Sequence, residues 1–579
     1  GISVASFFRA FFATLLALVV LIAAVVGVVA VKSGQKAKIK DHSYLVIDIY
    51  GEVLEYDPPG GVVSEVLGGE PETLTRILGN LEKAAADDRI DGVIMKLSAS
   101  NTLGRAMRGE IRESVKKVRA SGKKVYAFAD NINSSVYVLA APCDSIYMPP
   151  TGYITFTGFR VDGTYVKGTL EKLGIKPNVH RIKDYKSAAE MVTRADMSPE
   201  AREMYRWLLG DGWDYYVSCL GEDRGLTEEQ IAGIMDYALL RPVEAVERGL
   251  VDRLLYWDEL EGMLKQEKDE RLRTVSMSRY ADEERGDLGL EGKKKIAVVH
   301  AQGMIGGRTN KVDPVLGMLM GHESVNADLR RAMEDEDVAA IVFRVNSSGG
   351  ESLASDLIGR QVHVAAQVKP VVVSMVDVAA SGGYMIAYRA SRMVADPMTI
   401  TGSIGSISMK FNMKGLYDKL GMTHDYVTQG PSALFWSDTR DFTPEERERF
   451  EQNHWADFNA WLADVASCRG MTFEEAEKLA HGRVWTGRQA KENGLIDEVG
   501  GLDKAVEIAK ELAEIPGEER VTIVHYPKKQ DLFDMILSGD NIVASAARWA
   551  LYRFIREDLA GTVEMLEEGR FDYLAEPME

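Results

Sequence analysis

Short apolar runs alternate with longer amphipathic stretches along most of the 579-residue chain. In its second half, the apolar runs predict strands at Ile296–His300, Ala340–Val345, Val371–Met375 and Met393–Ala395. Apolar residues at helical spacing predict helices at Ser352–Gln367, Tyr384–Arg389, Pro444–Ser467 and Thr472–Leu479. Strands that alternate with helices form parallel βαβ units with right-handed crossovers, so the pattern predicts an α/β fold.

The same pattern occurs twice along the chain, which indicates an internal duplication. The separation between matching segments falls only from 252 to 245 residues, so the two copies differ by few insertions. The matches are Tyr44–Gly51 with Ile296–Gly303, Asp91–Leu97 with Ala339–Val345, and Ala245–Asp252 with Ala490–Asp497. Three matches in the same order predict tandem domains of one fold.

The duplication divides the chain into predicted domains. They are a membrane anchor at 1–40, a first α/β domain at 41–265, a highly charged linker at 266–294, a second α/β domain at 295–515, and a helical extension at 516–579. Within the extension, Ile542–Glu568 has the pattern of a helix whose aromatic stripe is typical of a packing surface.

The N-terminal region contains an uncharged run, Ala10–Val31. As a helix it would span roughly 33 Å, the thickness of a bilayer core. A cleaved signal peptide is the alternative, but its apolar core is normally only about 7–15 residues long. We therefore expect a retained anchor. The lysines that follow the run, Lys32, Lys36, Lys38 and Lys40, place the rest of the chain on the cytoplasmic side by the positive-inside rule.

Composition excludes several function classes. The chain is 46% hydrophobic and 27% charged, which is typical of a folded globular protein. Its net charge of -19 argues against a nucleic-acid partner, because such proteins need a basic face to neutralise phosphates. The three cysteines have neither a disulfide pattern nor metal-ligand spacing, so we expect no metal and no cofactor.

Two glycine-rich turns follow predicted strands and are candidates for catalytic chemistry. Ser381 ends a turn of small residues after the strand Val371–Met375 and opens a helix, where the first N–H groups are unpaired. That arrangement suits a nucleophile beside an oxyanion hole, although a serine that caps a helix has the same pattern. The turn Asn346–Gly350 also lets backbone N–H groups approach a ligand closely, and by itself it is equally typical of a plain turn.

No histidine is evidently paired with Ser381, and no glycine-flanked serine elbow occurs. A serine nucleophile without histidine needs another base, and lysine is the usual substitute. Lys186, within His180–Glu190, is the candidate, although a solvated surface lysine is the commoner explanation of any single lysine. The residues alone do not decide between these two.

Four motifs together resemble those of signal peptide peptidase A, also called protease IV, in its long duplicated form. They are Tyr185–Glu190, Arg344–Gly350, Ala379–Tyr384 and Thr401–Gly405. The resemblance runs from the anchor to about residue 515. It implies tandem crotonase-like domains, related to the subunit of the caseinolytic protease ClpP, that follow an N-terminal transmembrane helix.

The resemblance also implies roles for individual residues. Ser381 is the expected nucleophile, Lys186 the general base, and Ser403 the residue that orients the lysine amine. We further expect the N–H groups of Gly350 and Gly382 to hold the oxyanion. The family has proline where this chain has Ser348 and Met191, and these departures remove no catalytic atom.

The implied function is a serine endopeptidase of the bacterial inner membrane, anchored by a single pass through residues 10–31. Its expected substrates are signal-peptide remnants and other short unfolded peptides, and its expected assembly is a homo-oligomer, a tetramer or similar. The family places its catalytic domain outside the cytoplasm, whereas the local lysines place it inside.

Two alternative functions remain: a catalytically impaired membrane scaffold or chaperone, and a crotonase-type acyl-CoA enzyme. Labelling of Ser381 by a serine-reactive probe would distinguish them from a serine peptidase.

The duplication offers a second argument for the pair. Ser134 of the first domain aligns with Ser381, but Ser135 stands where Gly382 is, and the first domain lacks the glycine loop. Conversely, Lys186 aligns near Pro431, where the second domain has no lysine. We therefore expect one active site built from both domains.

Overall fold

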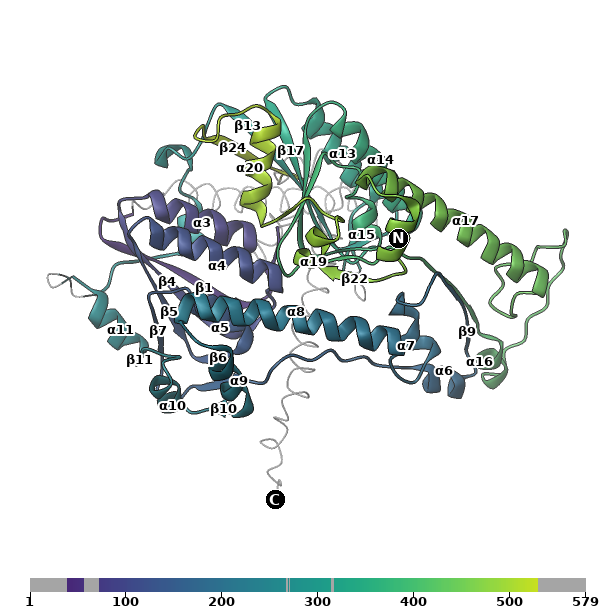
Figure 1. Ribbon diagram of the computed structural model, residues 1–579, viewed down its shortest axis with the longest axis horizontal. Coiled ribbons are helices and arrows are strands. Elements are labelled where there is room, and N and C mark those ends of the chain that lie inside the picture. The colour runs from purple at the N-terminus through teal and green to yellow at the C-terminus, as the bar shows by residue number, and fades with distance from the viewer. Residues whose placement is uncertain (1–38, 57–71, 267–268, 270, 314–316, 529–579) are drawn as a thin grey trace, which may run out of the picture.

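The computed structural model describes residues 39–56, 72–266, 269, 271–313 and 317–528. Figure 1 shows two α/β halves side by side, each built around a parallel sheet. The α/β prediction is therefore confirmed. The predicted anchor at residues 10–31 and the predicted helix at 542–568 lie outside the described residues, and no described helix is both long and apolar enough to cross a membrane.

The first half is organised around a six-stranded sheet with the order β11-β7-β5-β4-β1-β12. The strands are β1 (Ser43–Gly51), β4 (Ile90–Asn101), β5 (Lys124–Ala129), β7 (Ser145–Met148), β11 (Arg253–Leu254) and β12 (Thr274–Ser276). Helices α3 (Leu74–Ala86) and α4 (Arg105–Ala120) pack against it through Ile77, Leu81, Ile111 and Val115. Helix α3 begins where the Thr73 side chain accepts a hydrogen bond from Arg76 N.

The second half contains an eight-stranded sheet with the main order β22-β20-β18-β17-β13-β24, and β19 and β23 branch from β18. The strands are β13 (Lys294–Gln302), β17 (Val338–Ser347), β18 (Val371–Ala380), β19 (Arg392–Ala395), β20 (Ile400–Gly402), β22 (Val484–Thr486), β23 (Glu498–Val499) and β24 (Val521–Tyr526). The four strands predicted from apolar runs in this half are confirmed.

Both faces of this second sheet are buried. Alternate residues of β13 and β17 face helices α13 (His322–Glu334) and α14 (Ser352–Ala366) on one side, and α20 (Leu502–Leu512) on the other. Burial on both sides explains why these strands are continuous apolar runs instead of alternating ones. The helix predicted at Tyr384–Arg389 is shorter and earlier: α15 spans Gly382–Met385, and the chain then continues in turns such as Ala387 N to Tyr384 O.

The two halves repeat each other beyond the three matched segments. Helices α8 (Pro199–Arg224) and α17 (Pro444–Arg469) both have 26 residues, a Ser or Thr N-cap and proline at the start. Strands β12 and β24 occupy the same sheet edge, beside β1 and β13. The charged segment 266–294 thus contributes β12 and helix α12 (Met277–Ala281) to the first core, and the segment after residue 515 contributes β24 to the second.

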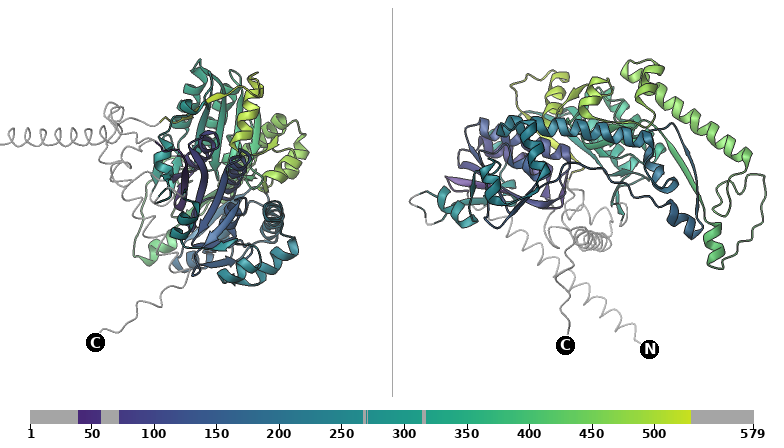
Figure 2. Two further views of the ribbon diagram at one scale, coloured as in Figure 1. Left: turned by 90° about the vertical axis from the view of Figure 1, so that its left-hand side faces the viewer. Right: turned by 60° about the horizontal axis from the view of Figure 1, so that its bottom comes forward.

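Helix α8 and a two-stranded ribbon join the halves. Figure 1 shows α8 extending from the first half across the second, where Trp207 stacks on Trp485 of β22 with ring centroids 5.1 Å apart. The ribbon is formed by β9 (Lys176–Arg181) and β21 (Ile407–Asn412), which pair antiparallel. Figure 2 shows the ribbon extending as an arm with α6 (Lys167–Leu173) and α16 (Lys414–Lys419). This pairing carries the segment after β9, including Lys186, onto the second half.

Candidate active site

Ser381 lies at the end of β18 and at the N-terminus of α15. Its backbone has φ 57° and ψ -117°, a conformation that is uncommon for a residue with a side chain and typical of strained functional sites. The turn is held by Ser381 N, which donates to Gly402 O at 2.9 Å. Glycine is required next, since an ideal Cβ on Gly382 would lie 2.5 Å from Ser355 Oγ. The backbone of the nucleophile turn is therefore held by one hydrogen bond and by close packing at residue 382.

Lys186 follows β9 and reaches Ser381 from the first half of the chain. Its Nζ lies 2.9 Å from Ser381 Oγ, 2.8 Å from Ser403 Oγ and 2.9 Å from Ser403 O. The structure thus brings together the three residues that the sequence singled out as nucleophile, base and orienting residue. They come from three separate segments, which follow β9, β18 and β20.

Burial controls the charge of this lysine. The side chain is 7% exposed, and desolvation lowers the pKa of Lys186 from 10.5 to about 7. Burial is the only cause of this shift, and the three polar contacts of Nζ are to uncharged oxygen atoms. A large fraction of the lysine is therefore neutral near pH 7 and able to accept a proton.

The turn 481–483 fixes the backbone of the lysine segment. Tyr185 N donates to His481 O at 3.1 Å, and Ser403 N donates to Arg483 O at 2.6 Å. Gly482, at φ 81°, lies directly against Lys186: an ideal Cβ there would be 2.5 Å from both Lys186 N and Lys186 Cβ. One turn therefore positions both the lysine and Ser403.

Replacing Gly482 with alanine is expected to lower peptide hydrolysis by about 10²-fold, because a displacement of about 1 Å in a catalytic group has an effect of that size. The matched control is Gly470→Ala, since Gly470 has φ 64° but open space around its Cβ position. Both variants carry the backbone strain of a left-handed residue, and Gly482→Ala adds the overlap with Lys186, so thermal unfolding should report a loss in both and the larger loss in Gly482→Ala. Equal activity in the two variants would show that the close approach to Lys186 is unimportant.

The predicted oxyanion donors lie beside the serine. Gly349 and Gly350 have φ 99° and 154°, and Ile305 N donates to Gly349 O at 2.8 Å, which holds the loop against β14 (Met304–Ile305). An ideal Cβ on Gly382 would be 3.0 Å from Gly350 N, so the two glycine backbones are adjacent. Neither Gly350 N–H nor Gly382 N–H donates a hydrogen bond to another described residue. Two free donors therefore flank Ser381.

The two departures from the family pattern lie at exposed positions. Ser348 is exposed, and Met191 is 50% exposed at the start of α7 (Glu190–Thr193). Ser134, the counterpart of Ser381 in the first half, is buried at the start of α5 (Ser134–Ala140). The structure thus brings the lysine to Ser381 and not to Ser134.

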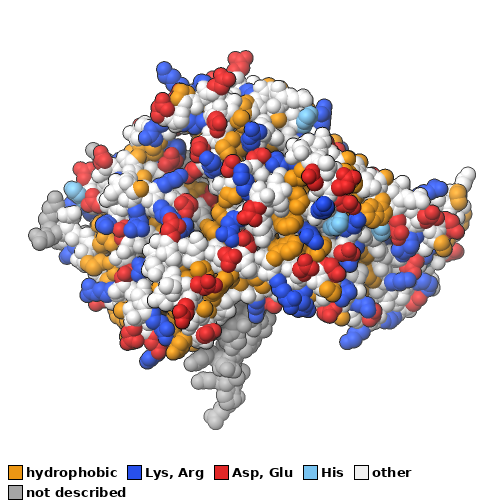
Figure 3. Space-filling model, viewed as in Figure 1, with side chains coloured by type: hydrophobic (Ala, Val, Ile, Leu, Met, Phe, Trp, Pro, Cys, Tyr) orange, Lys and Arg blue, Asp and Glu red, His pale blue; other side chains and the backbone are white. Residues whose placement is uncertain are grey.

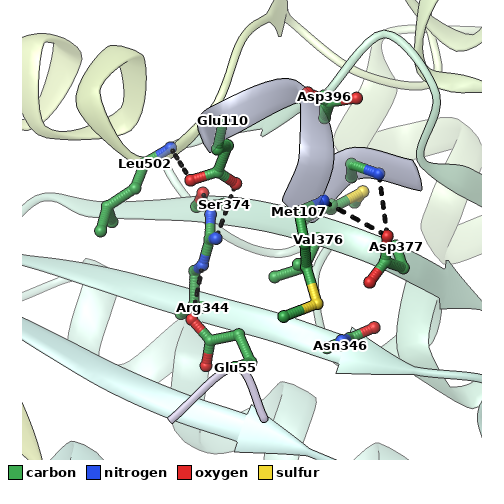
Figure 4. Close-up of polar contacts among 12 residues, drawn as sticks. Glu55, Met107, Glu110, Arg344, Asn346, Ser374, Val376, Asp377, Asp396 and Leu502 are labelled. Carbon is green, nitrogen blue, oxygen red and sulfur yellow. Dashed lines mark hydrogen bonds and ion pairs between the residues drawn. The ribbon is translucent and has the colours of Figure 1, made fainter. Parts of the chain in front are cut away.

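Sequence reasoning missed a buried polar cluster between the halves. Figure 4 shows Arg344 of β17 between Glu55 and Glu110, and Asp377 of β18 against Met107 of α4. The only signal in the sequence was a charged residue within each apolar strand, at positions 344 and 377. Such residues are rarely buried without partners, so they indicated partners elsewhere in the chain.

Known peptidases are similar in sequence to this chain. The sequence pattern of peptidase family S49 matches residues 117–271 and 363–516, one segment in each half. The chain is 34% identical to the chloroplastic serine protease SPPA of Arabidopsis thaliana, over 81% of this chain and 70% of that protein. It is 30% identical to Protease 4 of Salmonella typhi, over 86% of this chain and 82% of that protein.

Among solved structures, a mutant of the membrane-bound stomatin-specific protease 1510-N is 15% identical to this chain. The match covers 41% of this chain and 99% of that one, with a TM-score of 0.25. From the sequence matches, the chain belongs to peptidase family S49. It has the duplicated, long form of signal peptide peptidase A, and it is a serine-type peptidase.

Proposed function

We propose that this chain is a membrane-bound serine endopeptidase that uses a Ser381–Lys186 dyad. The single observation that carries the proposal is the contact of 2.9 Å between Lys186 Nζ and Ser381 Oγ, made by a lysine whose pKa burial lowers to about 7. A neutral amine has two N–H groups and one lone pair. With both N–H groups donating to Ser403 O and Ser403 Oγ, the lone pair is left for the Ser381 hydroxyl proton.

Acylation follows from this arrangement. Ser381 Oγ attacks the peptide carbonyl carbon while its proton passes to Lys186 Nζ. The negative charge that develops on the carbonyl oxygen is stabilised by the N–H groups of Gly350 and Gly382. The lysine ammonium then donates its proton to the leaving amine, the C–N bond breaks, and an ester to Ser381 remains.

Deacylation uses the same groups, with water as the nucleophile and Ser381 Oγ as the leaving group. A water molecule loses a proton to the neutral Lys186 and attacks the ester carbonyl, and the same two N–H groups hold the oxyanion. The lysine returns the proton to Ser381 Oγ as the ester breaks. The serine and the neutral lysine are regenerated, so the cycle consumes only water and one peptide bond.

The proposed substrates are signal-peptide remnants and other short unfolded peptides. Two arguments support this class: the resemblance to signal peptide peptidase A, and the apolar run at residues 10–31, which is long enough to hold the enzyme at the membrane where such peptides are released. We propose the bacterial inner membrane as its location, with a single pass and the catalytic halves outside the cytoplasm.

The test is hydrolysis of a fluorogenic peptide with an apolar signal-peptide core by the purified chain in detergent. A fluorophosphonate probe is added to a second sample, and the labelled peptide is identified by mass spectrometry. The proposal expects hydrolysis that is lost on labelling, with the label on Ser381. Hydrolysis that persists after complete labelling of Ser381 would contradict the dyad.

We also propose that copies of the chain assemble head to tail. Helix α8 covers β22 of the second half, through Trp207 on Trp485 and through Asp211, which accepts from Arg488 Nη2 at 2.5 Å. The counterpart of β22 in the first half is β10 (Ala238–Leu240), since each is the antiparallel neighbour of the equivalent strand, β20 or β8 (Tyr153–Phe156).

Strand β10 and its surroundings lack the cover that β22 has. Leu239 of β10 is 63% exposed, and Tyr237 and Val243 nearby are also exposed. The counterpart of α8 is α17, which borders a groove of about 700 Å³. Charges of both signs are interspersed over the face in Figure 3, with apolar patches between them. A second copy whose α17 covers β10 would repeat the contact between α8 and β22.

Leu239→Glu is expected to reduce the molar mass of the detergent-solubilised protein from an oligomer to a monomer, because it places a charge in the proposed contact. Light scattering after size-exclusion chromatography measures this. The control is Val368→Glu, an equally drastic change at a residue that is 61% exposed elsewhere. A monomeric wild type, or an oligomer that survives Leu239→Glu, would exclude this contact.

A further inference from the structure

The strand that leads to the nucleophile is interrupted by a bulge. Strand β18 pairs with β17 in regular register up to Val345 opposite Met375, and then resumes with Ser347 opposite Ala379. Before the interruption, at Val372–Met375, β18 pairs with β19, and after it, at Val378–Ala380, β18 pairs with β20. A β-bulge bends its strand and re-aims the residues that follow. Here the residues that follow are those that end in Ser381.

Asp377 lies within this bulge, and its side chain contacts the first half of the chain. Its Oδ1 accepts hydrogen bonds from Ala106 N at 2.8 Å and Met107 N at 3.4 Å, the first turn of α4 (Figure 4). The N-cap residue of α4 is Gly104, which has no side chain to cap these N–H groups, and a Cβ there would overlap the Asp377 carboxylate. Asp377 therefore caps a helix of the other half.

The cap is specific to the half that carries the nucleophile. In the first half, Asp130 stands at the corresponding break between β5 and β6 (Asn131–Asn133), and it is exposed. In the second half, the bulge is held from the other side as well, because Asn346 Oδ1 accepts from Val378 N at 3.2 Å. Asn346 begins the loop that carries Gly350, so the bulge connects the nucleophile turn to the oxyanion loop.

Helix α4 is itself anchored to the second half. Glu110 of α4 accepts from Arg344 Nη2 at 2.6 Å and from Leu502 N at 3.3 Å. Arg344, fully buried in β17, also donates to Glu55 at 3.0 Å and to Ser374 Oγ of β18 at 2.7 Å. The N-terminus of α4 thus presents its amides to Asp377 from a fixed position.

We propose that Asp377 is a positioning residue for the nucleophile: by capping α4, it fixes the bulge of β18 and so sets the place of Ser381 relative to Lys186 and the oxyanion amides. This inference rests on the proposed function. It assigns the first half a second contribution to the active site besides the lysine, namely a helix end that holds the nucleophile strand.

The test compares Asp377→Ala with Asp377→Asn in the full chain, using the fluorogenic peptide. The alanine variant loses the acceptor, whereas the asparagine variant keeps an oxygen at the position of Oδ1. We expect kcat to fall by about tenfold to a hundredfold in Asp377→Ala with KM within about twofold of wild type, and Asp377→Asn to recover most of kcat. Fluorophosphonate labelling of Ser381 should slow in parallel with kcat.

The control is Asp211→Ala, which removes another contact between the halves, the pair with Arg488, without touching β18. Its kcat should match wild type. If Asp377→Ala fails to fold, Asp377→Ser replaces it, since the shorter side chain does not reach both amides. Unchanged kcat in Asp377→Ala, or in Asp377→Ser where that replaces it, overturns the inference, and so does the same loss in Asp211→Ala. An inactive wild type would instead overturn the proposed function.

Discussion

Ser381→Ala and Lys186→Ala are each expected to reduce peptide hydrolysis by about 10⁴–10⁶-fold, since oxyanion donors and substrate binding retain only a small part of the catalysis of a serine peptidase. The two changes act on one proton-transfer unit, so the double variant should be no less active than either single one. Initial rates on the fluorogenic peptide measure this, and circular dichroism checks the fold.

Ser134→Ala is the matched control for the nucleophile. Ser134 is the buried counterpart of Ser381 in the first half, and no lysine among the described residues donates a hydrogen bond to its side chain. Its replacement should leave the rate within about twofold of wild type. Substantial activity in Ser381→Ala, or a large loss in Ser134→Ala, would place the chemistry elsewhere.

Lys186→Met is expected to stabilise the fold, and to do so most strongly at low pH. Burial depresses the pKa of Lys186 from 10.5 to about 7, so the unfolded chain binds more protons than the folded chain between these values. The lysine therefore destabilises the fold fully below pH 7, and this effect fades as pH rises toward 10.5. At about 1.4 kcal/mol per pKa unit, the destabilisation is about 5 kcal/mol at its largest.

Thermal unfolding of Lys186→Met and wild type at about pH 6 and about pH 10 tests this. The variant should melt higher at the lower pH, and the difference should nearly vanish at the higher one. Lys117→Met is the control, because the Lys117 side chain is 61% exposed and its ion pair with Asp503 is on the surface. Its removal should change the melting temperature little at either pH. A pH-independent difference for Lys186→Met would mean that the lysine is not buried in its neutral form.

The active site stores strain in its backbone as well as in its lysine. Ser381 and Ser403 both have positive φ, 57° and 51°, although neither is glycine. Residues in such conformations persist only where surrounding contacts hold them. Here the contacts are the hydrogen bonds of Ser381 N to Gly402 O and of Ser403 N to Arg483 O. The backbone strain and the buried lysine therefore both lower the stability of the fold at the active site, where they serve the reaction.

The strands and helices of the second half followed from the sequence because both faces of its sheet are buried, which produces unbroken apolar runs such as that of Val371–Met375. Two of the three matched segments of the duplication lie on strands, β1 with β13 and β4 with β17. The pairing of Ser381 with Lys186 could not be predicted from spacing, because the two residues are 195 positions apart in the chain. They meet where β9 pairs with β21 and where Tyr185 N donates to His481 O. Motif resemblance supplied what local pattern could not.

Other features depended on contacts between distant segments and left no local signal. Neither the bulge at Asp377 nor its cap on α4 could be predicted, because the amides that Asp377 accepts from lie 270 and 271 positions away. The charged segment 266–294 has the composition of a linker, yet Val275, Met277 and Tyr280 are buried in the first core. Burial of these three apolar residues at the sheet edge makes the segment part of the first domain, although most of its other residues are charged or polar.

The most direct test of the dyad is the rate at which a fluorophosphonate labels Ser381 as pH is varied. We predict a rate that rises with pH, reaches half its maximum near pH 7 as Lys186 loses its proton, and then stays constant. Lys186→Met should abolish this titration together with the labelling. Labelling of Ser381 at the same rate in Lys186→Met, or a midpoint near the ordinary lysine pKa of about 10.4, would contradict the claim that Lys186 is the base.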